Sequence, residues 1–94
     1  MPIRLKLTYH ALQRMRERRV RVREIAQIVE YGEVIEDYPD DSPYPSQLIC
    51  GVSGERTPHL VVAIDPKDEA RILVAVYDPD PQEWHPGFKT RRKP

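Results

Sequence analysis

The sequence predicts an α+β fold in which two N-terminal helices pack on a twisted antiparallel β-sheet. Three observations predict it. Apolar residues recur at helical spacing in the first third of the chain, a proline-rich loop follows, and β-branched runs fill much of the remainder. At 94 residues, the chain is expected to form a single domain over 1–94, with an N-terminal segment at 1–7 and a basic tail at 89–94.

The two helices are expected at about residues 9–19 and 22–31. Thr8 precedes a run without glycine or proline, so its hydroxyl suits the N-cap of the first helix. Gly32 supplies the stop of the second helix. The N-cap of the second helix is expected to be poor, because Arg21 stands where Ser, Thr or Asp would serve better.

The rest of the chain predicts an antiparallel meander. A short strand at 33–37 leads into a loop at 38–46, where three prolines remove backbone donors. Strands are expected at 46–53, 59–64 and 71–77, and a last segment is expected to be pinned to the body by Trp84 and Phe88. The last two strands are almost continuously apolar, which indicates a central, covered position in the sheet.

Composition excludes several classes of protein. Cys50 is the only cysteine, so an internal disulfide and a cysteine-based zinc site are ruled out, and its apolar neighbours suggest a small core residue. We expect no membrane span and a cytoplasmic location, because no apolar run or signal peptide is present. We also expect no cofactor and no metal, since the acidic residues sit in a proline-rich loop without a partner histidine: Glu36, Asp37, Asp40 and Asp41.

The formal net charge of zero conceals segregated charges. Residues 1–23 carry eight basic groups and one acid (+7), and residues 24–58 carry eight acids and one arginine (−7). This asymmetry predicts a polyanionic or oppositely charged partner. The alternative is that basic and acidic segments neutralise one another within the fold.

The first helix carries the first candidate site residues. His10, Arg14 and Arg18 recur at helical spacing away from the apolar stripe of Leu12 and Met15. Such a face could hold a phosphate through arginine, with a histidine that titrates near neutrality. The alternative is a solvated face, or one that docks on an acidic protein.

Two strand residues complete the candidate set. His59 opens an apolar strand and could supply a second acid/base group, or it could be a strand-end histidine bonded to backbone. Tyr77 ends the following strand and could assist, or it could simply cap the core.

The sequence resembles a bacterial and archaeal family, the domain of unknown function 4258, over roughly residues 8–92. The resemblance rests on His10-Ala-Leu-Gln-Arg-Met-Arg-Glu-Arg18, Gly32-Glu-Val-Ile-Glu-Asp-Tyr-Pro39, Pro58-His59-Leu-Val-Val, Val76-Tyr77-Asp-Pro79 and the ending from Trp84. It departs from the family pattern at Arg19 and Arg21, where a glycine and a capping serine would be expected, and this puts the helix–helix turn in doubt.

That family is similar to the RelE/ParE-like toxin superfamily of toxin–antitoxin modules. The resemblance implies a RelE-like toxin architecture, cleavage of free or ribosome-bound messenger RNA, and a zinc-finger antitoxin of the MqsA type as partner. The family-matching polar residues are His10, Arg14, Arg18, His59 and Tyr77.

Two functions of different classes follow. The first is a metal-independent endoribonuclease in which His10 and His59 act as acid and base, Tyr77 assists, and Arg14 and Arg18 bind phosphate. The second is a non-catalytic module that binds RNA or an acidic protein through the same helix. A weaker third interpretation makes the basic helix and the acidic loops a homodimer interface.

Overall fold

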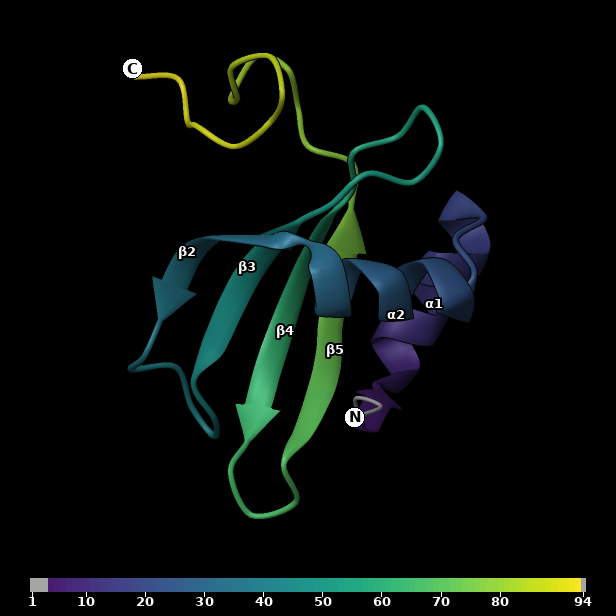
Figure 1. Cartoon of the computed structure of the whole chain (residues 1–94), viewed down its shortest axis with the longest axis vertical. Helices are drawn as coiled ribbons and strands as arrows, with labels where there is room; N and C mark the ends of the chain where they lie inside the picture. The colour runs from purple at the N-terminus through teal and green to yellow at the C-terminus, as the bar shows by residue number, and fades with distance from the viewer. Residues whose placement is uncertain (1–3, 94) are drawn as a thin grey trace.

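The computed structural model describes residues 4–93 and confirms the α+β fold class. The sheet has five strands. Figure 1 shows both helices in the N-terminal half of the chain, beside the sheet. In chain order the elements are β1 (Arg4–Leu7), α1 (Tyr9–Arg18), α2 (Val22–Tyr31), β2 (Glu33–Tyr38), β3 (Ser46–Cys50), β4 (His59–Asp65) and β5 (Ala70–Tyr77).

The sheet has the strand order β1-β5-β4-β3-β2. Strands β2 to β5 form the antiparallel meander that the sequence predicts, although β3 ends at Cys50 rather than at residue 53. Strand β1 was not predicted. It pairs parallel to β5, from Arg4 opposite Ala70 to Leu7 opposite Leu73, so the sheet is mixed. Strand β1 has only four residues and its partner lies more than sixty positions away, so no local sequence pattern predicts it.

The helix ends follow local chemistry. Thr8 is the N-cap of α1, and its hydroxyl accepts a hydrogen bond from the backbone N–H of Ala11 at 3.1 Å. Arg19 takes the left-handed conformation at φ 55°, where the family pattern would place a glycine. The side chain of Arg21 makes no cap to α2, as expected, but its backbone N–H donates to the Glu24 carboxylate at 3.0 Å.

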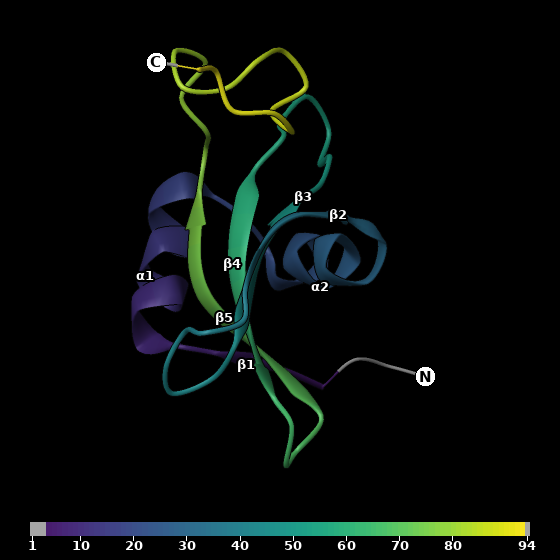
Figure 2. The same cartoon turned by 90° about the vertical axis from the view of Figure 1, so that its left-hand side faces the viewer.

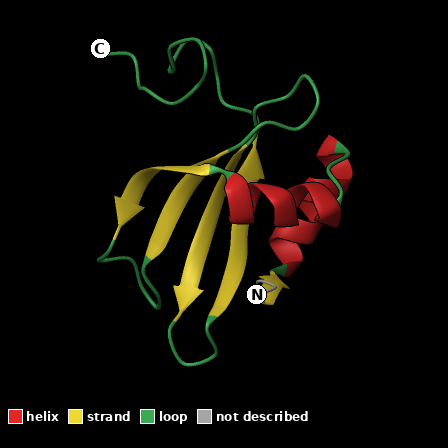
Figure 3. Ribbon diagram, viewed as in Figure 1, coloured by secondary structure: helices red, strands yellow, loops and turns green. Residues whose placement is uncertain are grey.

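The hydrophobic core lies between the helices and one face of the sheet. Helix α1 packs against β5, and α2 packs against β3 and β4. Figure 3 shows α1 beside the β5 side of the sheet and α2 crossing in front of the strands. The core is mainly aliphatic, as the composition predicts, with Ala11, Met15, Val20, Ile25, Ile28, Ile49, Leu60, Val62, Leu73 and Val76 at its centre.

The C-terminal segment, residues 79–93, leaves β5 and folds over the end of the sheet where β3 and β5 finish. Figures 1 and 2 show this segment beyond the strands, next to the loop that joins β3 to β4. Trp84 is only 2% exposed, which confirms that it pins the segment to the body. The segment holds its own shape, because the backbone N–H of His85 donates to Thr90 and that of Arg92 donates to Glu83.

Across residues 4–93, neither helix has the length and apolar character that a membrane crossing requires.

Candidate functional site

A strongly basic surface surrounds the turn between the two helices. Residues 9–23 contain six arginines and one acid, Glu17, a net charge of +5. We call the exposed cations of this stretch, together with His10, the basic helix surface; its arginines are Arg14, Arg16, Arg19, Arg21 and Arg23. Among residues 4–93, only one of these five arginines makes an ion pair, Arg14 with Glu17 at 3.1 Å. The other four present their charge to solvent.

The predicted helical ladder exists, but its three members differ in environment. His10 and Arg14 are exposed and one turn apart, whereas Arg18 is partly buried. Arg18 contacts Asp78 at 3.4 Å, and Asp78 also contacts Arg56 at 3.3 Å. Arg56 donates a second hydrogen bond to the carbonyl oxygen of Arg18 at 2.8 Å. The contacts of Arg18 with Asp78 and Arg56 therefore hold the end of α1 against the sheet.

His59 lies on the face of the sheet that is turned away from the helices. Leu60 points into the helix-covered core, so its neighbour in the strand points the opposite way. The imidazole is completely buried, and its ring meets Trp84 edge-on at 4.5 Å between centroids. Its Nε2 lies 2.7 Å from the carbonyl oxygen of Phe88. Burial lowers the pKa of His59, although the bond to Phe88 opposes that effect. His59 is thus the strand-end histidine bonded to backbone that the sequence left open as its alternative role.

Tyr77 pairs with His59 in the sheet, and the two rings pack edge to face at 5.5 Å. Burial raises the pKa of the Tyr77 hydroxyl, which keeps this group protonated at neutral pH. The structure therefore brings His59 and Tyr77 together. It does not bring them to His10, which is exposed on α1 and lies on the other side of the sheet.

Beside His59 lies a polar cluster that sequence reasoning missed. Arg91 donates two hydrogen bonds to the Glu36 carboxylate, at 2.6 and 3.2 Å, and its guanidinium lies 4.5 Å from the centroid of the Trp84 ring. The Tyr38 hydroxyl donates to the same carboxylate. The hydrogen bonds from Arg91 hold the pKa of Glu36 below its usual range. Charge was the only signal for this cluster in the sequence, which has a basic tail and an acidic strand that could attract each other.

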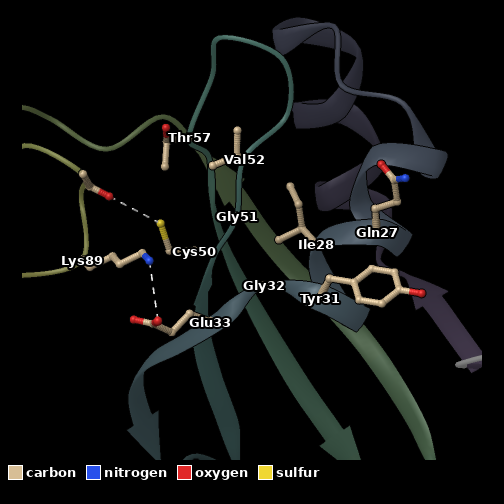
Figure 4. Close-up of a pocket in the computed structure, with 11 residues that line it drawn as sticks. Gln27, Ile28, Tyr31, Gly32, Glu33, Cys50, Gly51, Val52, Thr57 and Lys89 are labelled. Carbon is tan, nitrogen blue, oxygen red and sulfur yellow. Dashed lines mark hydrogen bonds and ion pairs between the residues drawn. The ribbon is translucent and has the colours of Figure 1, made fainter.

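An open cavity of about 690 Å³ lies between the end of α2, the loop after β3 and the C-terminal segment. Figure 4 shows Ile28 and Tyr31 on the helix side, and Cys50 and Lys89 on the other. Cys50 is buried, as predicted, and burial raises the pKa of its thiol, so the thiolate is disfavoured. Within residues 4–93, His, Cys, Asp and Glu form no group of three or more suited to a metal ion.

Fold and site together define a small α+β domain with an arginine-rich helix surface and a buried histidine under its C-terminal segment. The family model described as Domain of unknown function (DUF4258) matches residues 7–78, and the chain belongs to this family. The match confirms the resemblance to this family, and it ends at the last residue before the C-terminal segment. No curated protein and no solved structure matched the chain.

Proposed function

We propose that this protein is a non-catalytic RNA-binding module that uses the basic helix surface. The observation that carries the proposal is the four arginines of this surface without an ion pair among residues 4–93. Arginine binds phosphate oxygens through paired N–H donors, and clustered cations attract a polyanion over a long range. Such a surface is the electrostatic footprint of a nucleic-acid-binding protein.

The distribution of ion pairs supports an external partner. Acidic strand β2 is paired with the C-terminal segment, through Glu33 with Lys89 at 3.5 Å and Glu36 with Arg91 at 2.6 Å. The acids of β2 therefore neutralise Lys89 and Arg91, and they make no ion pair with Arg16, Arg19, Arg21 or Arg23 among residues 4–93. Ion pairing within the fold accounts for these two cations of the tail and does not account for the four unpaired arginines of the basic helix surface.

Binding fits the geometry better than cleavage by a histidine pair. General acid–base catalysis requires both groups to reach the reacting atoms, directly or through one water. His10 is exposed on α1, whereas His59 is completely buried and bonded to Phe88 on the other face of the sheet. A phosphate held at Arg14 has no route to the His59 ring in this conformation.

The test is a salt titration of binding to a fluorescein-labelled, twelve-nucleotide single-stranded RNA. The variant Arg16→Ala/Arg23→Ala removes two exposed arginines from helices, where alanine is at least as favourable. We expect affinity to fall about tenfold or more, and the slope of log K against log salt to shrink by about 1.4, because each lost phosphate contact removes about 0.7.

The control is Lys67→Ala/Lys93→Ala, which removes the same charge from exposed positions outside the basic helix surface. It should leave affinity within about twofold of the wild type, since only general attraction is lost. Equal losses in both variants would overturn the proposal, because binding would then follow net charge alone.

Metal-independent RNA cleavage of the toxin type is the second candidate. The observation that favours it is the exposure of His10 one turn from Arg14, which leaves an imidazole free beside a phosphate-binding group. In this case RNA would be cut in the presence of EDTA, and His10→Ala would abolish cutting and growth arrest. A zinc-finger antitoxin of the MqsA type is the partner this candidate requires, and co-expression with it should relieve growth arrest.

A further inference from the structure

The C-terminal segment is attached to the sheet almost entirely through side chains. Arg91 reaches Glu36, Trp84 packs on His59, and the Cys50 thiol lies 3.9 Å from the carbonyl oxygen of Gly87. The hydrogen bonds between backbone groups of residues 79–93 stay within the segment, for example from Phe88 to His85. Among the described residues, its carbonyl oxygens meet the sheet only at side chains, Phe88 at His59 and Gly87 at Cys50. The segment is therefore a ligand-like element laid on the surface, and not a further strand of the sheet.

The surface beneath this segment has the chemistry of a receptor for a cation. From Gly32 to Glu55 the chain contains no lysine or arginine, and its acids include Glu33, Glu36 and Asp37. The Glu36 carboxylate is only partly exposed and accepts hydrogen bonds from both Tyr38 and Arg91. Next to this carboxylate, the buried His59 ring packs edge-on against the aromatic ring of Trp84. The surface thus selects an arginine and a neighbouring aromatic residue.

The C-terminal segment is attached in a way that would let another segment replace it. The segment is joined to β5 by Asp78-Pro79-Asp80-Pro81, whose prolines cannot continue the sheet ladder. Of its two ionic contacts among the described residues, Lys89 with Glu33 is largely exposed on both sides and contributes little to stability, so Arg91 with Glu36 is the main ionic attachment. The family match ends at residue 78, so the segment lies outside the matched part of the chain.

We propose that the surface formed by Glu36, Tyr38 and His59 is a docking site for an arginine-bearing segment of a protein partner, a segment that is folded back on itself as residues 84–91 are. The chain's own C-terminal segment occupies this site and competes with the partner. Docking displaces Trp84 and Arg91 and replaces them with an aromatic residue and an arginine of the partner. The acidic surface selects the partner's positive charge, and the imidazole selects its ring. This site is separate from the basic helix surface and would take an occupant of opposite charge.

The probe is a fluorescein-labelled synthetic peptide that copies residues 80–94, added to the full-length protein. A tethered segment competes at an effective concentration in the millimolar range, so wild-type protein should bind the peptide weakly. Arg91→Ala in the protein weakens only the tethered competitor, and peptide affinity should rise about tenfold. Lys93→Ala, which removes a cation with no ion pair among the described residues, is the matched control and should resemble the wild type.

Glu36 supplies the second arm of the experiment. In the double variant Glu36→Gln/Arg91→Ala, the gain in peptide affinity should disappear. A peptide that carries alanine at the Arg91 position should bind weakly to every variant. Trp84 is the only tryptophan of the chain, so its fluorescence reports displacement directly. Acrylamide should quench Trp84 about twice as strongly in Arg91→Ala as in Lys93→Ala.

Two results would overturn the proposal. The first is a peptide affinity that stays unchanged in Arg91→Ala. The second is an Arg91→Ala protein that dimerises and binds no peptide, which would assign the surface to exchange between copies of this chain. Circular dichroism of every variant establishes that the fold is retained.

Discussion

The Nε2 atom of His59 and the carbonyl oxygen of Phe88 are 2.7 Å apart, and this contact fixes the state of a buried imidazole. A carbonyl oxygen can only accept, so Nε2 carries the proton and Nδ1 is the bare nitrogen. Nδ1 is buried and has no hydrogen-bond partner among the described residues. Burial lowers the pKa of His59, so the ring is neutral at neutral pH, and its protonation would place a charge beneath Trp84.

His59 should make the protein less stable on acidification. Because burial lowers its folded pKa below the unfolded value near 6.5, the unfolded chain takes up a proton first as pH falls. Stability is thus lost as pH falls through about 6.5 toward the folded pKa, by at most about 1.4 kcal/mol per pH unit. Urea unfolding between pH 7.5 and 5, followed by Trp84 fluorescence, measures the loss.

The variant His59→Phe is the control for this pH effect. It keeps an aromatic ring at the position and removes the titrating group, so its stability should depend much less on pH in the same window. The carboxylates with lowered pKa values, Glu24, Glu36 and Asp68, lose their contribution as pH falls from their unfolded pKa of about 4 through the lower folded pKa, below the window. An equal slope in both proteins would contradict the assignment.

Thr8 should contribute to stability in two ways. Its hydroxyl accepts from the backbone N–H of Ala11 and donates to the carbonyl oxygen of Leu73, both at 3.1 Å, so it caps α1 and ties it to β5. Thr8→Ala should cost about 1–2 kcal/mol, the range for loss of an N-cap. Thr8→Ser keeps the hydroxyl and should recover most of that loss in thermal or urea unfolding. Equal losses in Ala and Ser variants would show that the methyl group, and not the cap, is responsible.

Thr8 also illustrates what sequence reasoning can find. Its cap, the helix starting at Tyr9 and the antiparallel meander follow from local residue types and apolar periodicity, and the structure has all three. The parallel pairing of β1 with β5 and the contact between Arg91 and Glu36 join positions more than fifty residues apart. No local pattern encodes such pairings.

In the candidate site too, some features follow from local sequence and others depend on contacts between distant residues. The sequence places His59 at the start of one strand and Tyr77 at the end of the next, and in the antiparallel pair the two rings do pack together. The alternation of side chains along β4 then decides where His59 points, because Leu60 faces the core beneath the helices and His59 must face away from it. The face that His59 occupies depends on how the helices cover the sheet, which residue spacing alone does not specify.

Gly51 should tolerate no side chain. A Cβ at this position would lie 2.7 Å from both Cγ1 and Cγ2 of Ile28, a buried residue of α2. Gly51→Ala should therefore destabilise the protein by about 1–3 kcal/mol through overpacking. Ile28→Ala removes the obstructing atoms and opens a cavity of its own, so the double variant should lose less than the sum of the two single losses. Strict additivity in urea unfolding would show that the two positions are not in contact.

Arg56 should be more important than its place in a loop suggests. Its guanidinium donates to the carbonyl oxygen of Arg18 at 2.8 Å, near the end of α1 where backbone carbonyls lack helical partners, and to Asp78 at 3.3 Å. It thus ties the helix end to the residue that follows β5. We expect Arg56→Ala to cost about 1–2 kcal/mol of unfolding free energy, since hydrogen bonds to charged groups are stronger than neutral ones and this one is partly screened by solvent.

Arg56→Lys distinguishes geometry from charge in this contact. A lysine keeps the charge but lacks the planar fork that reaches a carbonyl and a carboxylate together, so it should restore less than half of the loss. The neighbouring Glu55→Ala, at an exposed position, should leave stability within about 0.5 kcal/mol of the wild type. Full recovery by lysine would instead assign the stabilisation to the general attraction between Asp78 and a nearby cation, and the helix-end hydrogen bond would then be incidental.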